Sequence, residues 1–95
     1  MLKLQGNDIY RGPDKIGWLQ ENHIFDRTGK KIGYFEQNYV YDADARKLAY
    51  VEEDFLMPYG GAASAKVRLE QIAEDVTGGV VPEIARAAIY ILLGS

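Results

Sequence analysis

The sequence predicts a mainly β fold, an antiparallel meander of about eight short strands that is curled or closed and is followed by a C-terminal helical segment. Two patterns lead to this prediction. Over residues 1–59, short segments rich in β-branched and aromatic residues alternate with polar turns. From residue 60 onward, apolar residues recur at intervals of three or four, which is typical of helices. We therefore expect a single domain, made of a four-repeat meander at 1–59 and a helical segment at 60–95 that packs on it.

The meander is predicted from a four-fold internal repeat. Its clearest copies are LQGNDIY at 4–10, LQENHIF at 19–25 and FEQNYVY at 35–41, and a weaker copy is VEEDFLM at 51–57. A second unit recurs between them as KIGW at 15–18, KIGY at 31–34 and KLAY at 47–50, so that its lysines are 16 residues apart. Tandem copies of so short a unit favour a fold in which each copy contributes one hairpin.

Two sets of turns are expected to join the strands. The hairpin turns are the pairs 6–7, 21–22, 37–38 and 53–54, which end in Asn or Asp, residues that tolerate the positive φ of primed turns. The connecting turns occupy 11–14, 26–30 and 42–46. Asp26 followed by Gly29 fits a type I turn that closes through a left-handed residue and a bulge. Ala45 stands where Gly29 stands one repeat earlier, so a retained turn would strain it.

The third position of each KIGW-type unit is very small, as Gly17, Gly33 and Ala49. Glycine in a strand weakens it, so its return indicates close approach of a neighbouring backbone or of an aromatic ring lying across it. Simple alternation places Ile16 and Trp18 on one face of the strand and Gly17 and Leu19 on the other. Because both faces then carry apolar groups, we expect a curled or closed sheet rather than a flat one.

Three segments carry a resemblance to a known family: IFD at 24–26, GKKIGY at 29–34 and VYD at 40–42. This sixteen-residue pattern resembles the four-fold beta-flower family of small bacterial proteins, and the resemblance covers about residues 4–57. It implies a petal-like β fold and a bacterial origin. The family carries no assigned reaction, so the resemblance implies no site residues. The chain departs from the pattern at Ala45 and Ala49, and at Met57-Pro58, where no aspartate follows.

Two helices are expected in the C-terminal segment. The first has Ser64 as its candidate cap and Gly78-Gly79 as its stop, and its apolar face consists of Ala65, Leu69, Ile72, Ala73 and Val76. The second begins near Pro82 and ends at Gly94. Its apolar residues spread around much of its circumference, and its stripe consists of Ile84, Ala87, Ala88, Ile91 and Leu92. We expect 95 residues to be too few to surround such a helix, so that another chain would share it.

Composition limits the classes of function. The net charge of −3 offers no global reason to bind nucleic acid, so we do not expect nucleic acid as a partner. The chain has no cysteine, which suits a reducing compartment. Its first residues show no apolar signal-peptide run, and the apolar stretch at 80–93 is shorter than the roughly 20 residues needed to span a bilayer. We expect a cytoplasmic protein that does not bind membranes.

No set of residues favours catalysis. His23 is the single histidine and is placed beside a turn, so we interpret it as a surface residue. Asp42, Asp44 and the acidic run at 52–54 are expected in turns, where solvated carboxylates suit neither acid–base chemistry nor a calcium site. We expect a protein that is not an enzyme, with no catalytic, cofactor-binding or metal-binding residues and no cofactor.

Two sets of residues are candidates for ligand binding. The first is the ring ladder of Trp18, Tyr34 and Tyr50, which would stack on sugars or bases if exposed. The second is the basic rim of the connecting turns, represented by Arg27, Lys30, Lys31, Arg46 and Lys47. The simpler interpretation is that the rings pack in the core and that the turns use aspartate for hydrogen bonding.

The sequence favours an interaction role over these ligand sites. We predict a non-catalytic structural or interaction module that self-associates or binds a protein partner, with a homo-oligomer as the expected form. The candidate interface lies on the second helix and consists of Ile84, Ala88, Ile91 and Leu92. The alternative is a module that binds carbohydrate or nucleic acid through the repeated aromatic residues or the basic rim.

Overall fold

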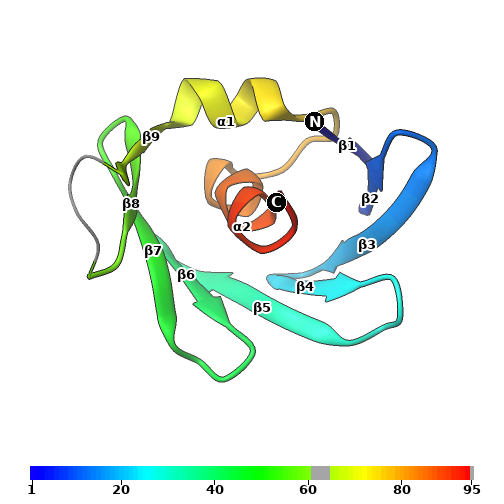
Figure 1. Cartoon of the computed structure of the whole chain (residues 1–95), viewed down its shortest axis with the longest axis horizontal. Coiled ribbons are helices and arrows are strands. Elements are labelled where there is room, and N and C mark those ends of the chain that lie inside the picture. Colours follow the sequence, from blue (N-terminus) through cyan, green and yellow to red (C-terminus); the bar gives the residue numbers. More distant parts are fainter. Residues whose placement is uncertain (61–64, 95) are drawn as a thin grey trace.

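The protein is one curled sheet with a helix inside the curl (Figure 1). The computed structural model describes residues 1–60 and 65–94. Within these residues the sheet has ten strands in the order β10-β1-β2-β3-β4-β5-β6-β7-β8-β9, and all neighbours are antiparallel except β1 and β10. β9 and β10 form its two edges, so the sheet is not closed into a barrel. Helix α1 spans the gap between the edges, and α2 runs through the interior (Figure 1).

The first eight strands form four hairpins, and two short strands complete the sheet. The eight are β1 (Leu2–Gln5), β2 (Asp8–Arg11), β3 (Asp14–Gln20), β4 (His23–Asp26), β5 (Lys31–Glu36), β6 (Tyr39–Asp42), β7 (Lys47–Glu52) and β8 (Phe55–Pro58). The prediction of a mainly β meander is confirmed, although the described strands number ten rather than about eight. The segment expected to be only helical adds β9 (Val67–Arg68) and β10 (Val76–Thr77). These pair with β8 and β1, whose backbone groups would otherwise be exposed at the edges.

The hairpin turns have the predicted two-residue length, but the strained residue is not the predicted one. Positive φ occurs at the first turn residue, namely Gly6 (60°), Glu21 (55°), Gln37 (53°) and Glu53 (54°). The expectation that the following Asn or Asp would adopt it is therefore wrong. The carbonyl of this second residue instead accepts a hydrogen bond from the next unit of the fold, as in Asn22 O from Phe35 N (3.0 Å) and Asn38 O from Val51 N (2.8 Å). Each turn is thus tied to the segment that follows it.

The two longer connecting turns match the predicted type. Gly29 and Ala45 both have positive φ, 89° and 66°, and their N–H groups donate to the carbonyls of Asp26 (3.0 Å) and Asp42 (3.1 Å). The strand register shifts next to each turn, which is the predicted bulge. Ala45 therefore adopts the strained conformation that its alignment with Gly29 predicts.

A bulge overturns the predicted alternation at the start of β3. The register between β2 and β3 shifts after Ile9, which leaves Ile16 as the extra residue. Ile16 joins the buried core at 7% exposed, so its assignment to the same face as Trp18 is wrong. Lys15 lies beside Trp18 instead, with its Nζ 5.3 Å from the ring centroid.

The small residues of the repeat line the inner wall of the sheet, where α2 passes. A Cβ added to Gly33 would lie 2.5 Å from the carbonyl oxygen of Tyr41 and 2.6 Å from Leu92 Cδ1 on α2. A Cβ added to Gly17 would overlap the carbonyl oxygen of Phe25. The predicted close approach is confirmed, and it is made by backbone and by α2 rather than by an aromatic ring.

The first helix is shorter than the sequence predicts. α1 occupies Leu69–Asp75 instead of starting near Ala65, because residues 67–68 form β9 and pair with β8. The cap assigned to Ser64 lies outside the described residues. Leu69 and Ile72 are the buried residues of α1.

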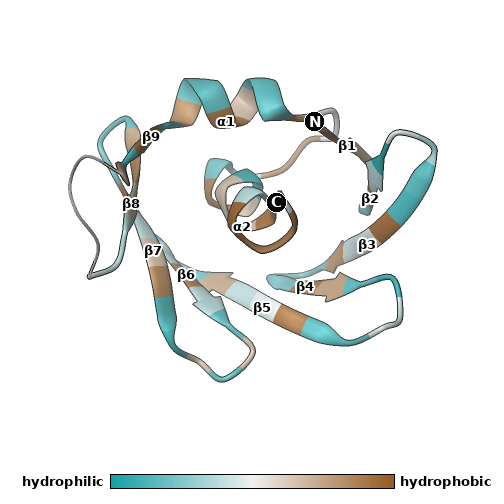
Figure 2. Ribbon diagram, viewed as in Figure 1, coloured by the Kyte–Doolittle hydropathy of each residue, from teal (hydrophilic) through white to brown (hydrophobic). Residues whose placement is uncertain are grey.

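The second helix is enclosed by the chain's own sheet and by α1. α2 spans Glu83–Leu93, between Pro82 and Gly94, as predicted. Figure 2 shows hydrophobic residues along most of it, and its buried residues are Ala85, Ala87, Ala88 and Ile89. The expectation that 95 residues could not surround this helix is wrong, because the sheet and α1 enclose its buried residues, and the glycines of the sheet let Leu92 and Leu93 lie close to the strands. Neither of the two described helices is long and apolar enough to cross a membrane.

Candidate functional site

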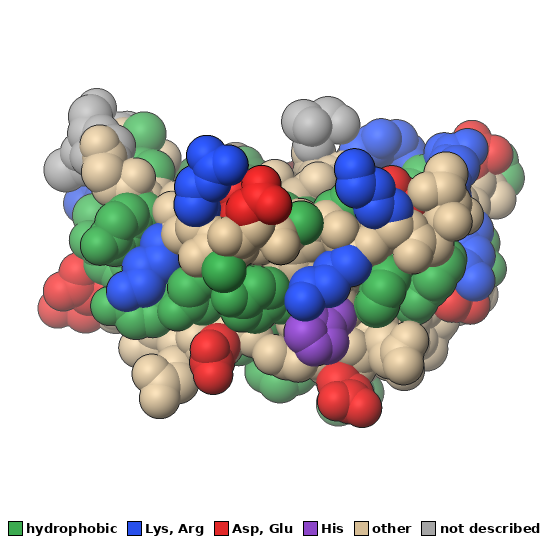
Figure 3. Space-filling view, turned by 90° about the horizontal axis from the view of Figure 1, so that it is seen from below, with side chains coloured by type: hydrophobic (Ala, Val, Ile, Leu, Met, Phe, Trp, Pro, Cys, Tyr) green, Lys and Arg blue, Asp and Glu red, His purple; other side chains and the backbone are tan. Residues whose placement is uncertain are grey.

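The outer face of the sheet is the surface of β3 to β8 that is turned away from α2, and it carries a band of aromatic rings. These are Trp18, Phe25, Tyr34, Tyr39, Tyr41, Tyr50 and Phe55, all half-buried, with Tyr59 beside them at 53% exposed. In Figure 3 hydrophobic side chains form a broken band, and Lys and Arg side chains lie across it. The interpretation that Trp18, Tyr34 and Tyr50 pack in the core is wrong, because none of them belongs to the buried core.

Cross-strand stacking orders the rings of the outer face. Trp18 opposes Phe25 with ring centroids 5.5 Å apart and planes at 12°, and Tyr34 opposes Tyr41 at 4.7 Å and 8°. Such pairs stabilise a sheet directly. Tyr50 differs because Met57 opposes it, and its contacts with Tyr39 and Tyr59 are tilted (46°) and edge-on (81°).

Lysine amines lie over these rings at every second strand. The pairs are Lys15 with Trp18 (5.3 Å to the centroid), Lys31 with Tyr34 (4.8 Å), Lys47 with Tyr39 (4.2 Å) and Lys66, next to β9, with Phe55 (4.2 Å). Tyr41 stacks on Tyr34 at about the distance at which Lys31 lies over it, and two groups so close cannot share one ring face. Tyr41 and Lys31 therefore cover opposite faces of Tyr34.

The lysines differ in their charge partners. Lys15 Nζ lies 3.1 Å from Asp8 Oδ1 in a surface ion pair. Within residues 1–60 and 65–94, no carboxylate is within ion-pair distance of Lys31 or Lys47. The amines on β5 and β7 are thus available to an anion outside the chain.

The aspartates of the connecting turns satisfy backbone groups, as the simpler interpretation predicts. Asp26 Oδ1 accepts hydrogen bonds from the N–H of Thr28 (2.8 Å), its hydroxyl (2.5 Å) and the N–H of Lys30 (3.1 Å). The Thr28 hydroxyl is the main reason that the pKa of Asp26 falls below its ordinary 3.8; burial opposes the shift, and the two backbone bonds support it. Asp42 accepts the N–H groups of Asp44 and Arg46, both at 2.9 Å. These carboxylates are therefore committed to turn structure.

The basic rim is only partly available for binding. The head group of Arg46 lies 3.3 Å from Asp44 and 3.8 Å from Asp42, so two carboxylates already partner it. Arg27 and Lys30 are exposed in their turn, while Lys31 and Lys47 belong to the outer face. Three of the five rim residues, Arg27, Lys30 and Arg46, thus belong to the turns, and the other two, Lys31 and Lys47, belong to strands of the outer face.

Two further groups of the outer face shape its polarity. Burial raises the pKa of Tyr34, and the nearby Tyr41, Glu36 and Asp42 add to the shift, so its hydroxyl stays a neutral donor. His23 is half-buried in β4, with its ring 5.9 Å from that of Tyr34, rather than standing free beside a turn. Its Nδ1 is buried without a hydrogen-bond partner among the described residues.

The four residues of the candidate interface on α2 differ in how far they are buried. Ala88 is fully buried inside the chain, and Ile84 and Leu92 are half-buried against the core. Ile91 is 36% exposed near the C-terminal end of α2, where Arg11 Nη2 donates to the carbonyl of Leu93 (2.6 Å). Ile91 is thus the member of this set that is most open to a partner.

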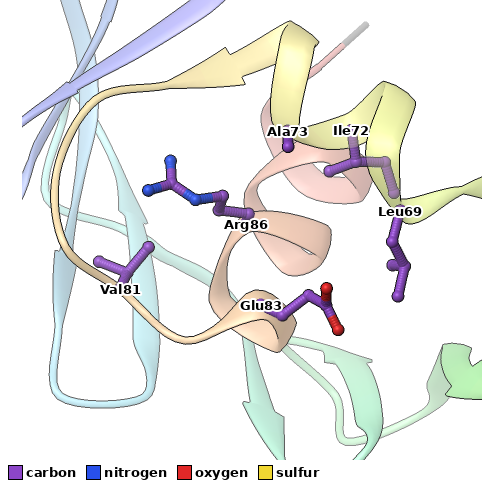
Figure 4. Close-up of a pocket in the computed structure, with 6 residues that line it drawn as sticks. All are labelled: Leu69, Ile72, Ala73, Val81, Glu83 and Arg86. Atoms are coloured by element: carbon purple, nitrogen blue, oxygen red, sulfur yellow. The ribbon is translucent and has the colours of Figure 1, made fainter. Parts of the chain in front are cut away.

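A small hollow lies between α1 and α2 (Figure 4). It measures about 180 Å³ and is lined by Leu69, Ile72, Ala73, Val81, Glu83 and Arg86. The guanidinium of Arg86 points away from Glu83 and donates to the carbonyls of Val76 and Gly79, both at 3.0 Å (Figure 4). Arg86 therefore holds the turn after β10. The hollow itself is smaller than the roughly 300 Å³ at which ligand pockets begin. No group of three or more metal-ligating side chains occurs in the described part of the chain.

The recurrence of Phe25 and Tyr41 is visible in the sequence, but their stacking on Trp18 and Tyr34 was not predicted from it. The stacking partners Phe25 and Tyr41 occupy the same place in successive repeats, and each repeat unit begins with a lysine. These regularities were the available signal. Comparison with known proteins found no matching family model, no matching curated sequence and no matching solved structure. The resemblance to the four-fold beta-flower family stays a prediction.

Proposed function

We propose that the chain is a non-catalytic interaction module that binds a partner or ligand through the outer face of its sheet. The observation that carries this proposal is the band of half-exposed rings over which lie the amines of Lys31 and Lys47, two lysines without an ion-pair partner among the described residues. Aromatic rings provide a large contact area at low conformational cost, and strands hold them in fixed positions. We also propose that its four hairpins are tandem copies of one unit, in keeping with the family that the chain resembles.

A binding screen tests this assignment. Wild type and the double variant Lys31→Glu/Lys47→Glu are applied to arrays of glycans, oligonucleotides and peptides, with circular dichroism as the check on folding. We expect at least one class to bind wild type and to bind the double variant several-fold less, because the variant reverses two charges of the face. Binding that the double variant leaves unchanged in every class would contradict the role of the outer face.

Self-association is a second candidate, and the exposure of Ile91 beside the half-buried Leu92 supports it. A symmetric dimer that covers Ile91 would remove apolar surface from water. Light scattering behind size exclusion, on wild type and Ile91→Glu, measures the mass of each. We expect a wild-type dimer that the variant breaks, because a buried unpaired carboxylate costs several kcal/mol. A wild-type mass of 10.7 kDa would rule self-association out.

A further inference from the structure

We propose that the outer face binds an acidic polysaccharide, a stiff sugar chain with carboxylates or sulfates at regular intervals, laid across β5, β6 and β7. This inference rests on the proposed function, which assigns binding to the same face. It adds the chemical class of the ligand and the residues that recognise it.

Two lysine amines determine which anions the outer face can accept. Lys31 on β5 and Lys47 on β7 have their amines positioned over rings, and neither has an ion-pair partner among the described residues. Strands two apart in a sheet are separated by roughly 10 Å, so the two lysines leave the backbone at about that spacing and present a pair of positive charges on the same face. A polymer with anions at fixed intervals matches such a pair.

The ring stacks argue against ligands that depend on open aromatic faces. Both faces of Tyr34 are covered, by Tyr41 and by Lys31, and Trp18 has Phe25 stacked on it and Lys15 over it. Single-stranded nucleic acid and neutral sugars gain much of their affinity by stacking on free ring faces. Stacking therefore leaves little open ring face at Trp18 and Tyr34, whereas the lysine amines beside these rings stay attractive to an anion.

Phenol groups fill the space between the two lysines. Tyr39 and Tyr41 stand on β6, between β5 and β7, with Tyr34 and Tyr50 on either side of them. None of these four hydroxyls makes a hydrogen bond within the part of the chain that the structure describes. A phenol hydroxyl both donates and accepts hydrogen bonds. The four tyrosines therefore suit the hydroxyl groups of a sugar ring that lies between two charged sugar rings.

Chain stiffness favours a polysaccharide over an acidic peptide. The site offers exposed ion pairs, each of which contributes little. Every residue of a flexible peptide that is fixed across the strands loses backbone entropy that exceeds this gain. A stiff sugar chain has lost most of that freedom before it binds, so the same two contacts suffice to hold it weakly.

The test measures binding of wild type to polygalacturonate and to chondroitin sulfate by calorimetry at low salt, with dextran, poly-L-glutamate and oligo(dT) as comparison ligands. We expect binding to at least one acidic polysaccharide, none to dextran, and affinity that falls as salt rises. In Lys31→Gln/Lys47→Gln we expect affinity to fall by about two- to fivefold for each lysine removed. Lys15→Gln is the matched control and should change affinity by less than about twofold, because Asp8 already pairs with this lysine.

The outcomes separate this inference from the proposed function. Absence of binding to both acidic polysaccharides, or binding that the double variant leaves unchanged, would overturn the inference. Tighter binding of poly-L-glutamate or oligo(dT) that depends on Lys31 and Lys47 would also overturn it, while supporting the outer face as the contact surface. If the array screen shows no interaction that depends on Lys31 and Lys47, both the inference and the proposed function are overturned.

Discussion

On strand β6, Val40 is fully buried beneath α2, whereas its neighbours Tyr39 and Tyr41 stay half-exposed on the other side of the same strand. The inner face of the sheet uses aliphatic residues and glycines, which let a helix pass close to the backbone. The outer face uses aromatic rings that cover one another and carry lysines. The comparison teaches that the large residues of a small domain need not all serve the core, because a helix from the C-terminal segment fills it instead.

The largest expected effect is on α2, where a buried and a partly exposed isoleucine can be compared directly. Ile89 is fully buried, so Ile89→Ala should lower the free energy of unfolding by about 2–5 kcal/mol through lost contacts and a cavity. Ile91, two residues further on, is 36% exposed, and Ile91→Ala should cost less than about 1 kcal/mol. Urea unfolding of both variants gives the two values. Equal effects would mean that α2 is not enclosed by the sheet.

The inner wall is tested at Gly33. Gly33→Ala should destabilise by about 1–3 kcal/mol, because the new Cβ would press on the Tyr41 carbonyl and on Leu92, and the backbone and helix must move apart. Ala49 holds the corresponding place on β7 with its Cβ already accommodated, so Ala49→Gly should cost about 1 kcal/mol. Thermal unfolding followed by circular dichroism measures both. A stabilised Gly33→Ala would show that the helix lies further from the sheet.

The outer face should respond less than the core. Tyr34→Ala removes the stack with Tyr41 and the contact with Lys31, which together should cost about 1–2 kcal/mol. Tyr34→Phe keeps the ring and serves as its control, with an expected change below about 0.5 kcal/mol. Chemical denaturation of the two variants provides the comparison. A loss as large as that of Ile89→Ala would place Tyr34 energetically in the core.

The smallest expected effect is a gain. Ala45 has a φ of 66°, so Ala45→Gly should relieve roughly up to 1 kcal/mol of backbone strain, partly offset by the greater entropy of the unfolded glycine. Ala43 lies in the same turn without positive φ, and Ala43→Gly should leave stability unchanged or lower it. Differential scanning calorimetry should show a melting temperature raised by a few degrees only for the first variant. A decrease would mean that the strain at Ala45 is compensated elsewhere.

The sequence by itself determined the local elements, because these depend on neighbours along the chain. Residue pairs such as Gln37-Asn38 close hairpins, Asp26 and Gly29 define a turn, and Pro82 and Gly94 bound α2. Each signal acts within a few residues, where turn chemistry and backbone conformation are set directly by side-chain type.

Only the tertiary structure decided which surface is inside. A one-residue bulge moved Ile16 into the core and brought Lys15 alongside Trp18. The alternation of residues along one strand cannot reveal such a bulge, because a bulge is defined by how two strands pair. Enclosure of α2 likewise depends on how closely its Leu92 approaches Gly33, a contact between residues far apart in the chain. The outer face emerged as the candidate site for the same reason. With α2 filling the interior, the repeated rings are left on the surface, where they stack on one another beneath the lysines.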